Sequence, residues 1–314
     1  LPYFSEVIRK CGAVGQGFAQ IAQRREACTG GLWSATAILS HATNTTQPLR
    51  RQQFGLKTLD AEAEKAFALL GDIVFGIDPN DRARLHDMMI QTRARHRTAL
   101  VNDGMSTARR QAERGLNLVA AINHQFFSPD ALRAVESLTE SFDTRADEFI
   151  HKIEAIRDFL HNRRRWTISF TGSDTVFDQL LKTLTAWSAR MDDSPIVDVL
   201  PAFKAYGTPP REGLAGPMQV AHCAEVMPAP YLAHPDVSLF KLGLRLANFD
   251  YMLPAIRLKG NAYGGGASYD SMIGTLALYS FRDPNIVETL DTFKGLRDFI
   301  ASQDWTQLDI DQSG

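Results

Sequence analysis

Residues 256–266 read Ile256-Arg257-Leu258-Lys259-Gly260-Asn261-Ala262-Tyr263-Gly264-Gly265-Gly266. In this stretch an arginine and a tyrosine stand six residues apart, and four glycines flank them. Because glycine lets another backbone come close and both long side chains carry hydrogen-bond donors, the stretch suits the binding of a peptide carbonyl. A bound extended chain would also give glycines a reason to stand inside a strand, which they otherwise weaken. A glycine-rich hairpin with a surface arginine explains the same spacing equally well.

The elements around this stretch mix strands and helices. Beyond residue 217 we expect a strand at 218–227, a helix at 236–251, a pair of strands at 266–281 and a helix at 285–302. Earlier in the chain, strands are predicted at 31–39, 53–57 and 164–170. Apolar residues at helical spacing predict helices at 4–10, 17–25, 61–75, 81–114, 129–139, 144–161 and 174–190. Proline and glycine are frequent in residues 194–216, which we interpret as a linker between domains at 1–193 and 217–314.

The composition is that of an ordinary globular protein. The 314 residues are 44% hydrophobic and 22% charged, with a formal net charge of −2. These values exclude disordered, collagenous and disulfide-rich classes, and the charge argues against a general nucleic-acid binder. The three cysteines (Cys11, Cys28 and Cys223) form no C-x-x-C pair, and we find no run of about 18 apolar residues that would span a membrane. Leu1 rather than Met begins the sequence, so we expect a piece of a longer protein.

Common catalytic motifs are not found in the sequence. His151 and His222 each begin an H-x-x-E pattern, but neither has the second histidine that a zinc site on a helix needs. There is no G-x-S-x-G elbow and no Walker lysine, and residues 12–17 have the wrong glycine spacing for a dinucleotide turn. The arginines of residues 82–114 and 163–165 suggest a nucleic-acid surface only weakly, because acidic residues lie among those of 82–114.

Two motifs carry a resemblance to a known family. The first is Arg257…Gly260-Asn261-Ala262-Tyr263-Gly264-Gly265, and the second is Ser280-Phe281-Arg282-Asp283-Pro284-Asn285, extended by Thr289-Leu290-Asp291. They resemble R-x-x-G-G-A-Y-G-G and S-Y-R-D-P-N in the C-terminal half of the insulinase/pitrilysin superfamily of zinc metallopeptidases, presequence-protease branch. Asn261 replaces a glycine and Phe281 a tyrosine, so only local backbone geometry differs from the pattern.

The resemblance implies a fold and a domain arrangement. Members are built from four related two-layer α+β domains, each with an antiparallel-rich sheet and helices packed on one face, and two halves close into a chamber. Residues 1–193 would then be a degenerate third domain, and residues 217–314 the first part of the fourth.

The zinc motif of the family is H-x-x-E-H, in the first domain. When the first helix here is aligned by the glycine that follows it, Tyr3 and Val7 fall on the motif's two histidines and Glu6 falls on its glutamate. Tyrosine and valine supply no imidazole ligand. The resemblance therefore implies that this chain binds no metal and contains no catalytic residue, and that zinc belongs to the N-terminal half of the parent enzyme.

The resemblance also implies what this half contributes. Arg257 and Tyr263, with Gly264 and Gly265 beside them, would contact the substrate backbone and stabilise charge that develops on the scissile carbonyl. The expected partners are the N-terminal catalytic half of the same polypeptide and unstructured peptides, without nucleic acid or membrane. The alternative is a catalytically inactive scaffold or peptide-binding subunit of the same superfamily. The sequence leaves the cellular compartment open.

Overall fold

The computed structural model describes residues 2–41, 43–44, 47–197, 202–205 and 210–312. Contacts divide the chain into two compact units that are not continuous in sequence. The first contains residues 1–37, 50–93 and 135–201, and the second contains residues 38–49, 94–134 and 202–314. The predicted division into 1–193, a linker and 217–314 concerns homologous domains rather than contacts and stays a prediction.

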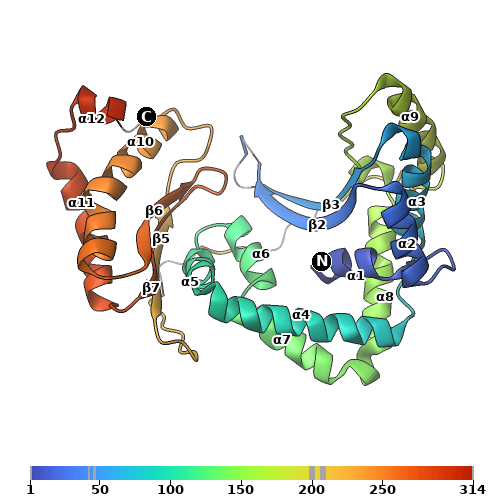
Figure 1. Cartoon of the computed structure of the whole chain (residues 1–314), viewed down its shortest axis with the longest axis horizontal. Coiled ribbons are helices and arrows are strands. Elements are labelled where there is room, and N and C mark those ends of the chain that lie inside the picture. Colours follow the sequence, from blue (N-terminus) through green and yellow to red (C-terminus); the bar gives the residue numbers. More distant parts are fainter. Residues whose placement is uncertain (1, 42, 45–46, 198–201, 206–209, 313–314) are drawn as a thin grey trace. The chain divides into compact units, whose positions relative to one another are not determined.

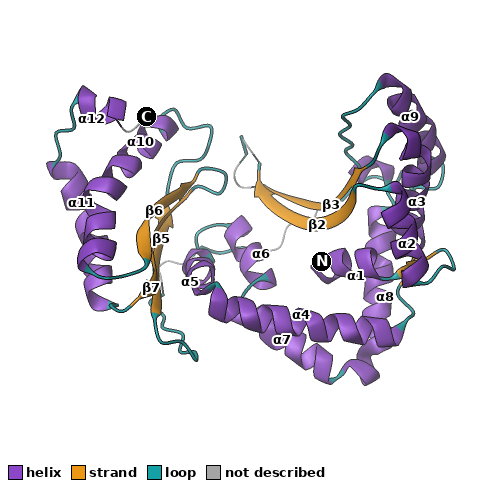
Figure 2. Ribbon diagram, in the orientation of Figure 1, coloured by secondary structure: helices purple, strands orange, loops and turns teal. Residues whose placement is uncertain are grey.

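The first unit is mainly helical (Figures 1 and 2). Its elements are α1 (Pro2–Lys10), β1 (Gly12–Ala13), α2 (Phe18–Cys28), β2 (Gly31–Ser40), β3 (Pro48–Lys57), the 3₁₀ turn η1 (Asp60–Glu62), α3 (Ala63–Gly76), β4 (Ile77–Asp78), the first part of α4 (Arg82–Asn102), α8 (Phe142–Leu160), η2 (Arg163–Arg165) and α9 (Asp174–Ser188). β2 and β3 pair with each other, and β1 pairs antiparallel with β4. The apolar faces of α1, α3, α4 and α8 meet in one core, which includes Phe4, Leu69, Met89 and Ile153.

The second unit is built on a three-stranded antiparallel sheet. Its elements are the rest of α4, α5 (Gly104–Glu113), α6 (Leu118–Phe126), the start of α7 (Pro129–Glu140), β5 (Ala221–Pro228), α10 (Val237–Ala247), the π-helical turns η3 (Asn248–Met252) and η4 (Pro254–Lys259), β6 (Gly264–Asp270), β7 (Thr275–Asp283), α11 (Val287–Ser302) and α12 (Gln307–Gln312). The strand order is β5-β7-β6. Leu278 of β7 packs with Leu244, Met252, Ile256 and Phe293 of the helices that cover one face of the sheet.

Alternation along β5 explains how both faces of this sheet are used. Cys223 belongs to the core under the covering helices, and the preceding His222 points to the other face, as expected for neighbours in a strand. There the ring of His222 packs on α5 at Gly104, where a Cβ would lie 2.5 Å from the imidazole. In Figure 1, α10 and α11 lie on one side of the sheet and α5 on the other.

Most of the predicted elements are present, but the strand expected at 164–170 is wrong. Those residues form the short turn η2 and then irregular chain. Trp166 instead stacks on Phe75, with ring centroids 5.8 Å apart, and donates a hydrogen bond from Nε1 to the carbonyl oxygen of Leu160. The alternating apolar pattern here reflects aromatic packing against helices rather than a sheet. The sequence analysis also did not predict α6 or the π-helical continuation of α10.

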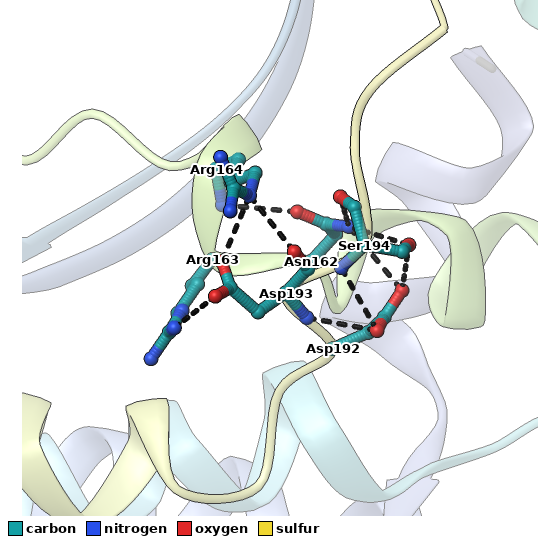
Figure 3. A network of polar contacts seen from close by, with 6 residues as sticks. All are labelled: Asn162, Arg163, Arg164, Asp192, Asp193 and Ser194. Carbon is teal, nitrogen blue, oxygen red and sulfur yellow. Dashed lines mark hydrogen bonds and ion pairs between the residues drawn. The ribbon is translucent and has the colours of Figure 1, made fainter.

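A polar network fixes the chain after α9 to the end of α8 (Figure 3). The Asn162 side-chain amide donates to the Ser194 carbonyl oxygen at 3.0 Å, and Arg164 Nε donates to the Asp193 carbonyl oxygen at 2.8 Å. Arg163 pairs with the Asp193 carboxylate. These ion pairs hold the pKa of Asp193 at about 2, chiefly through the hydrogen bond from Arg163. The start of the predicted linker is thus bound within the first unit.

The predicted linker, 194–216, contains no helix or strand in its described residues, 194–197, 202–205 and 210–216. Residues 198–201 and 206–209 lie outside the described part of the chain. Near the other end, the Glu212 carboxylate accepts hydrogen bonds from Arg114 at 2.5 Å and from Gln111 at 2.8 Å, both on or next to α5. Each end is therefore attached by side chains to its own unit.

Candidate peptide-contact site

Arg257 and Tyr263 lie at the two ends of one turn. Arg257 stands in η4 and is exposed, and Tyr263 immediately precedes β6 with 64% of its surface exposed. Between them, Asn261 has a left-handed backbone with φ 58°, which asparagine tolerates better than most residues. This explains why Asn261 stands where the related motif has glycine. Neither the Arg257 nor the Tyr263 side chain makes a hydrogen bond or ion pair within the described residues, so the donors of both remain available.

The turn is held by the second motif. The Asn285 side-chain amide donates to the Gly260 carbonyl oxygen at 2.5 Å. Asp283, only 1% exposed, accepts hydrogen bonds from the Asn285 backbone N–H at 2.9 Å and from the Thr289 hydroxyl at 2.7 Å. The Ala262 backbone N–H also donates to the Ile256 carbonyl oxygen at 3.1 Å. These contacts fix the backbone that carries Arg257 and Tyr263.

Asp283, Asn285 and Thr289 are positioning residues that the sequence analysis did not assign. Their signal was present, because all three belong to the second motif and its extension. Asp283 is placed just before α11, where a side-chain oxygen can accept from the helix's first residues. Pattern reading found these residues but gave them no physical role.

The three consecutive glycines pack against side chains of the protein itself. A Cβ on Gly264 would meet the Phe281 ring, one on Gly265 would lie 2.5 Å from Ile256 Cγ2, and one on Gly266 would lie 2.8 Å from Asn248 Oδ1. The π-helical turns therefore approach β6 more closely than any larger residue would permit. Of the two explanations left open by the sequence, this packing supports an internal reason for the glycines. The substrate contact expected of Gly264 and Gly265 stays a prediction.

The ring of Tyr263 lies between two residues of β7. Its centroid is 5.4 Å from that of Phe281 and 5.4 Å from the guanidinium carbon of Arg282. The charge of Arg282 also reaches His222, whose pKa is lowered first by burial and then by this arginine. Positive charge is thus concentrated beside the exposed phenol.

The three residues aligned with a zinc motif follow one another along α1. The Tyr3 ring packs edge-on against Phe149, with centroids 5.9 Å apart, and Val7 is 1% exposed in the core. The Glu6 carboxylate pairs with Arg9 at 2.6 Å and with Lys10 at 2.9 Å. No group of three or more histidine, cysteine, aspartate or glutamate side chains in the described chain is arranged to hold a metal ion. These residues do not fit a zinc site, because two lack ligand atoms of the required kind and the third is already paired with cations.

Comparison with known proteins places the chain in a family. The model of a region associated with M16 peptidases of subfamily C matches residues 1–138, and the model "PreP C-terminal domain" matches residues 232–311. The mitochondrial presequence protease of Kluyveromyces lactis is 23% identical over 322 residues, and that of Saccharomyces cerevisiae is 25% identical over 326. Each alignment covers 100% of this chain and 33% of the relative. The chain belongs to the presequence-protease branch of the M16 peptidases.

This M16 chain spans about a third of the length of the curated relatives it matches. Its residues 232–311 are of the C-terminal type, as the second family model indicates. The family resemblance inferred from the two motifs is confirmed. The whole relatives are named as proteases, and what this chain contributes to such a protein is a separate question.

Solved structures confirm the predicted α+β fold class of the M16 chain. The peptidase M16 inactive domain from Pseudomonas fluorescens superimposes with a TM-score of 0.59 at 13% identity, covering 99% of this chain and 71% of that one. A conserved protein from Enterococcus faecalis V583 gives a TM-score of 0.62 at 11% identity, covering 99% and 73%. No helix in the described ranges is long and apolar enough to cross a membrane.

Proposed function

We propose that this chain is the non-catalytic C-terminal half of a zinc metalloendopeptidase that degrades unstructured peptides. In this proposal the N-terminal half of the same polypeptide supplies the zinc and the residues that cut the peptide bond. The present chain closes the chamber and contributes Arg257 and Tyr263. Alone it is inactive, and Tyr3, Glu6 and Val7 are the remnants of a lost zinc motif.

One observation carries the proposal. Arg257 and Tyr263 are both exposed, make no hydrogen bond or ion pair within the described residues, and sit on a turn whose backbone is fixed by Asn285. Donors that are held in place without an internal partner can bind a carbonyl oxygen without first breaking another contact. The Arg257 guanidinium and the Tyr263 hydroxyl would donate to the substrate backbone, and their bonds strengthen as negative charge develops on the scissile carbonyl oxygen.

The test uses the full-length gene product and measures peptide hydrolysis together with bound zinc. We expect Arg257→Ala or Tyr263→Phe to lower kcat by about 10²- to 10³-fold, the range seen when one oxyanion donor is removed, with the zinc content unchanged. Tyr279→Phe is the matched control, because Tyr279 lies in β7 and its hydroxyl makes no hydrogen bond among the described residues.

Three outcomes would overturn the proposal or part of it. Full activity in both variants would remove the assigned roles of Arg257 and Tyr263. Stoichiometric zinc and hydrolysis by the 314-residue chain alone would show that its first domain is not degenerate. A full-length protein that is zinc-free and inactive would instead support an inactive scaffold or peptide-binding subunit.

A further inference from the structure

The backbone of Arg282 is unusual for a residue within a strand. It has φ 49°, in the left-handed region, where the side chain crowds the backbone and glycine or asparagine is normally found. In the described chain, only Val14 and Asn261 share this feature among non-glycine residues. Backbone strain of this kind persists where the surrounding structure enforces it, and it is concentrated at functional sites.

The left-handed residue forms a β-bulge. In the pairing of β5 with β7, His222 is opposite Phe281 and Ala221 is opposite Asp283, so Arg282 is an extra residue without a partner in β5. Successive residues of a regular strand point to opposite faces, and a bulge changes the direction of a side chain. Here both Phe281 and Arg282 reach the same ring, that of Tyr263.

Arg282 contacts Tyr263 in two ways. Its carbonyl oxygen accepts a hydrogen bond from the Tyr263 backbone N–H at 3.2 Å. Its guanidinium carbon lies 5.4 Å from the centroid of the Tyr263 ring, within the range of a cation–π interaction. An exposed tyrosine without such contacts would sample several rotamers, and ordering it on binding would reduce affinity.

We infer that Arg282 is a positioning residue, which holds the Tyr263 ring from β7 so that the phenol hydroxyl is presented to a substrate carbonyl. The inference rests on the proposed function of Tyr263. The strained bulge is the means by which the guanidinium reaches the ring. Arg282 itself makes no contact with the reacting atoms in this scheme.

Arg282→Gly is the decisive variant, because glycine adopts the left-handed backbone readily and keeps the bulge while the guanidinium is lost. Arg282→Lys keeps a cation of different shape. Arg245→Ala is the matched control, since Arg245 lies over Phe249 elsewhere in the same unit, at 6.0 Å. We expect Arg282→Gly to fold with an unchanged or higher Tm.

The first measurement is structural and needs no activity. In the chain labelled with ¹³C-tyrosine, the NMR signal of Tyr263 is the one that disappears in Tyr263→Phe. We expect Arg282→Gly to shift this signal and Arg245→Ala to leave it unchanged. An unchanged Tyr263 signal in Arg282→Gly would overturn the inference.

The second measurement is kinetic, in the full-length protein. We expect Arg282→Gly to lower kcat about two- to fivefold, the equivalent of an exposed cation–π contact, with a smaller change in KM and partial rescue by Arg282→Lys. In a Tyr263→Ala background the same substitution should have no effect, because Arg282 acts through the ring. An equal loss in both backgrounds would overturn the inference. A shifted NMR signal combined with full activity of Tyr263→Phe would instead refute the proposed function.

Discussion

The side chain of Asn248 hydrogen-bonds both backbone groups of Ala267. Its Oδ1 accepts from the Ala267 N–H at 2.6 Å, and its Nδ2 donates to the Ala267 carbonyl oxygen at 2.8 Å. Since β6 is the last strand in the order β5-β7-β6, these groups lie on the free edge of the sheet. The amide thus takes the place of a neighbouring strand and begins the π-helical turn η3. An extended peptide cannot add to β6 at Ala267 unless Asn248 leaves.

Replacing Asn248 by aspartate tests this pairing. Asn248→Asp keeps the size of the side chain but loses the donor, and its carboxylate faces the Ala267 carbonyl oxygen. We expect local opening of β6 to become easier by about 2 kcal/mol, the cost of leaving a partly buried carbonyl unpaired. Hydrogen exchange of residues 264–270 measures this directly, which matters because a chain with two units need not unfold in one step. Asn102→Asp, at the exposed end of α4, is the control, and equal exchange in both variants would contradict the prediction.

The close contact between β6 and η4 predicts a large effect of one methyl group. In Gly265→Ala the new Cβ would lie 2.5 Å from Ile256 Cγ2 and 2.9 Å from the Tyr279 carbonyl oxygen. Because one of these neighbours is backbone and the other is buried, we expect a loss of about 1–3 kcal/mol in unfolding free energy. Gly213→Ala provides the comparison, since nothing lies within 4 Å of a Cβ there. If thermal denaturation showed the two variants to be equally stable, the packing explanation for the glycine would be wrong.

Asn261 offers a test of backbone conformation in the turn that carries Arg257 and Tyr263. Its φ of 58° suits glycine and asparagine but not alanine. We therefore expect Asn261→Gly to change the unfolding free energy by less than about 0.5 kcal/mol and Asn261→Ala to lower it by about 1 kcal/mol. Chemical denaturation of the two variants side by side decides the matter. A more stable alanine variant would show that the left-handed conformation is absent in solution.

The sequence was most informative where side chains repeat with a regular period or match a motif. Apolar periodicity located α1, α3 and α8, and the two motifs identified the family correctly. It was least informative where long-range contacts decide the conformation. The residues around Trp166 alternate like a strand but pack their rings against α3 and α9, and no local pattern distinguishes the two cases.

The candidate site was predictable as a set of residues but not as a geometry. Arg257 and Tyr263 stand out by spacing, whereas their supports come from elsewhere in the chain. Asn285 lies 25 positions from Gly260, and the bulge at Arg282 depends on pairing with β5. The sequence also offered no sign that the helix begun at residue 237 continues as π-helical turns, because that path depends on the contact of Asn248 with β6. Bulges and such turns arise from tertiary pairing, which single-sequence patterns do not encode.

The last prediction concerns pH and the half-buried His161. Its Nε2 lies 3.0 Å from the Val74 carbonyl oxygen and its ring 4.8 Å from the Phe75 ring. Burial lowers its pKa, and this effect outweighs the opposing one of the Val74 hydrogen bond. Because the folded pKa lies below the unfolded one, the unfolded chain takes up the proton first as the pH falls. The stabilisation is therefore complete above the unfolded pKa, near 6.5, and is lost as the pH falls through the folded pKa. We expect the Tm of His161→Gln to fall less than that of the unsubstituted chain between about pH 7.5 and pH 5. His151→Gln, at an exposed position of α8, should keep the original slope, and a slope unchanged in His161→Gln as well would assign the pH dependence to other groups.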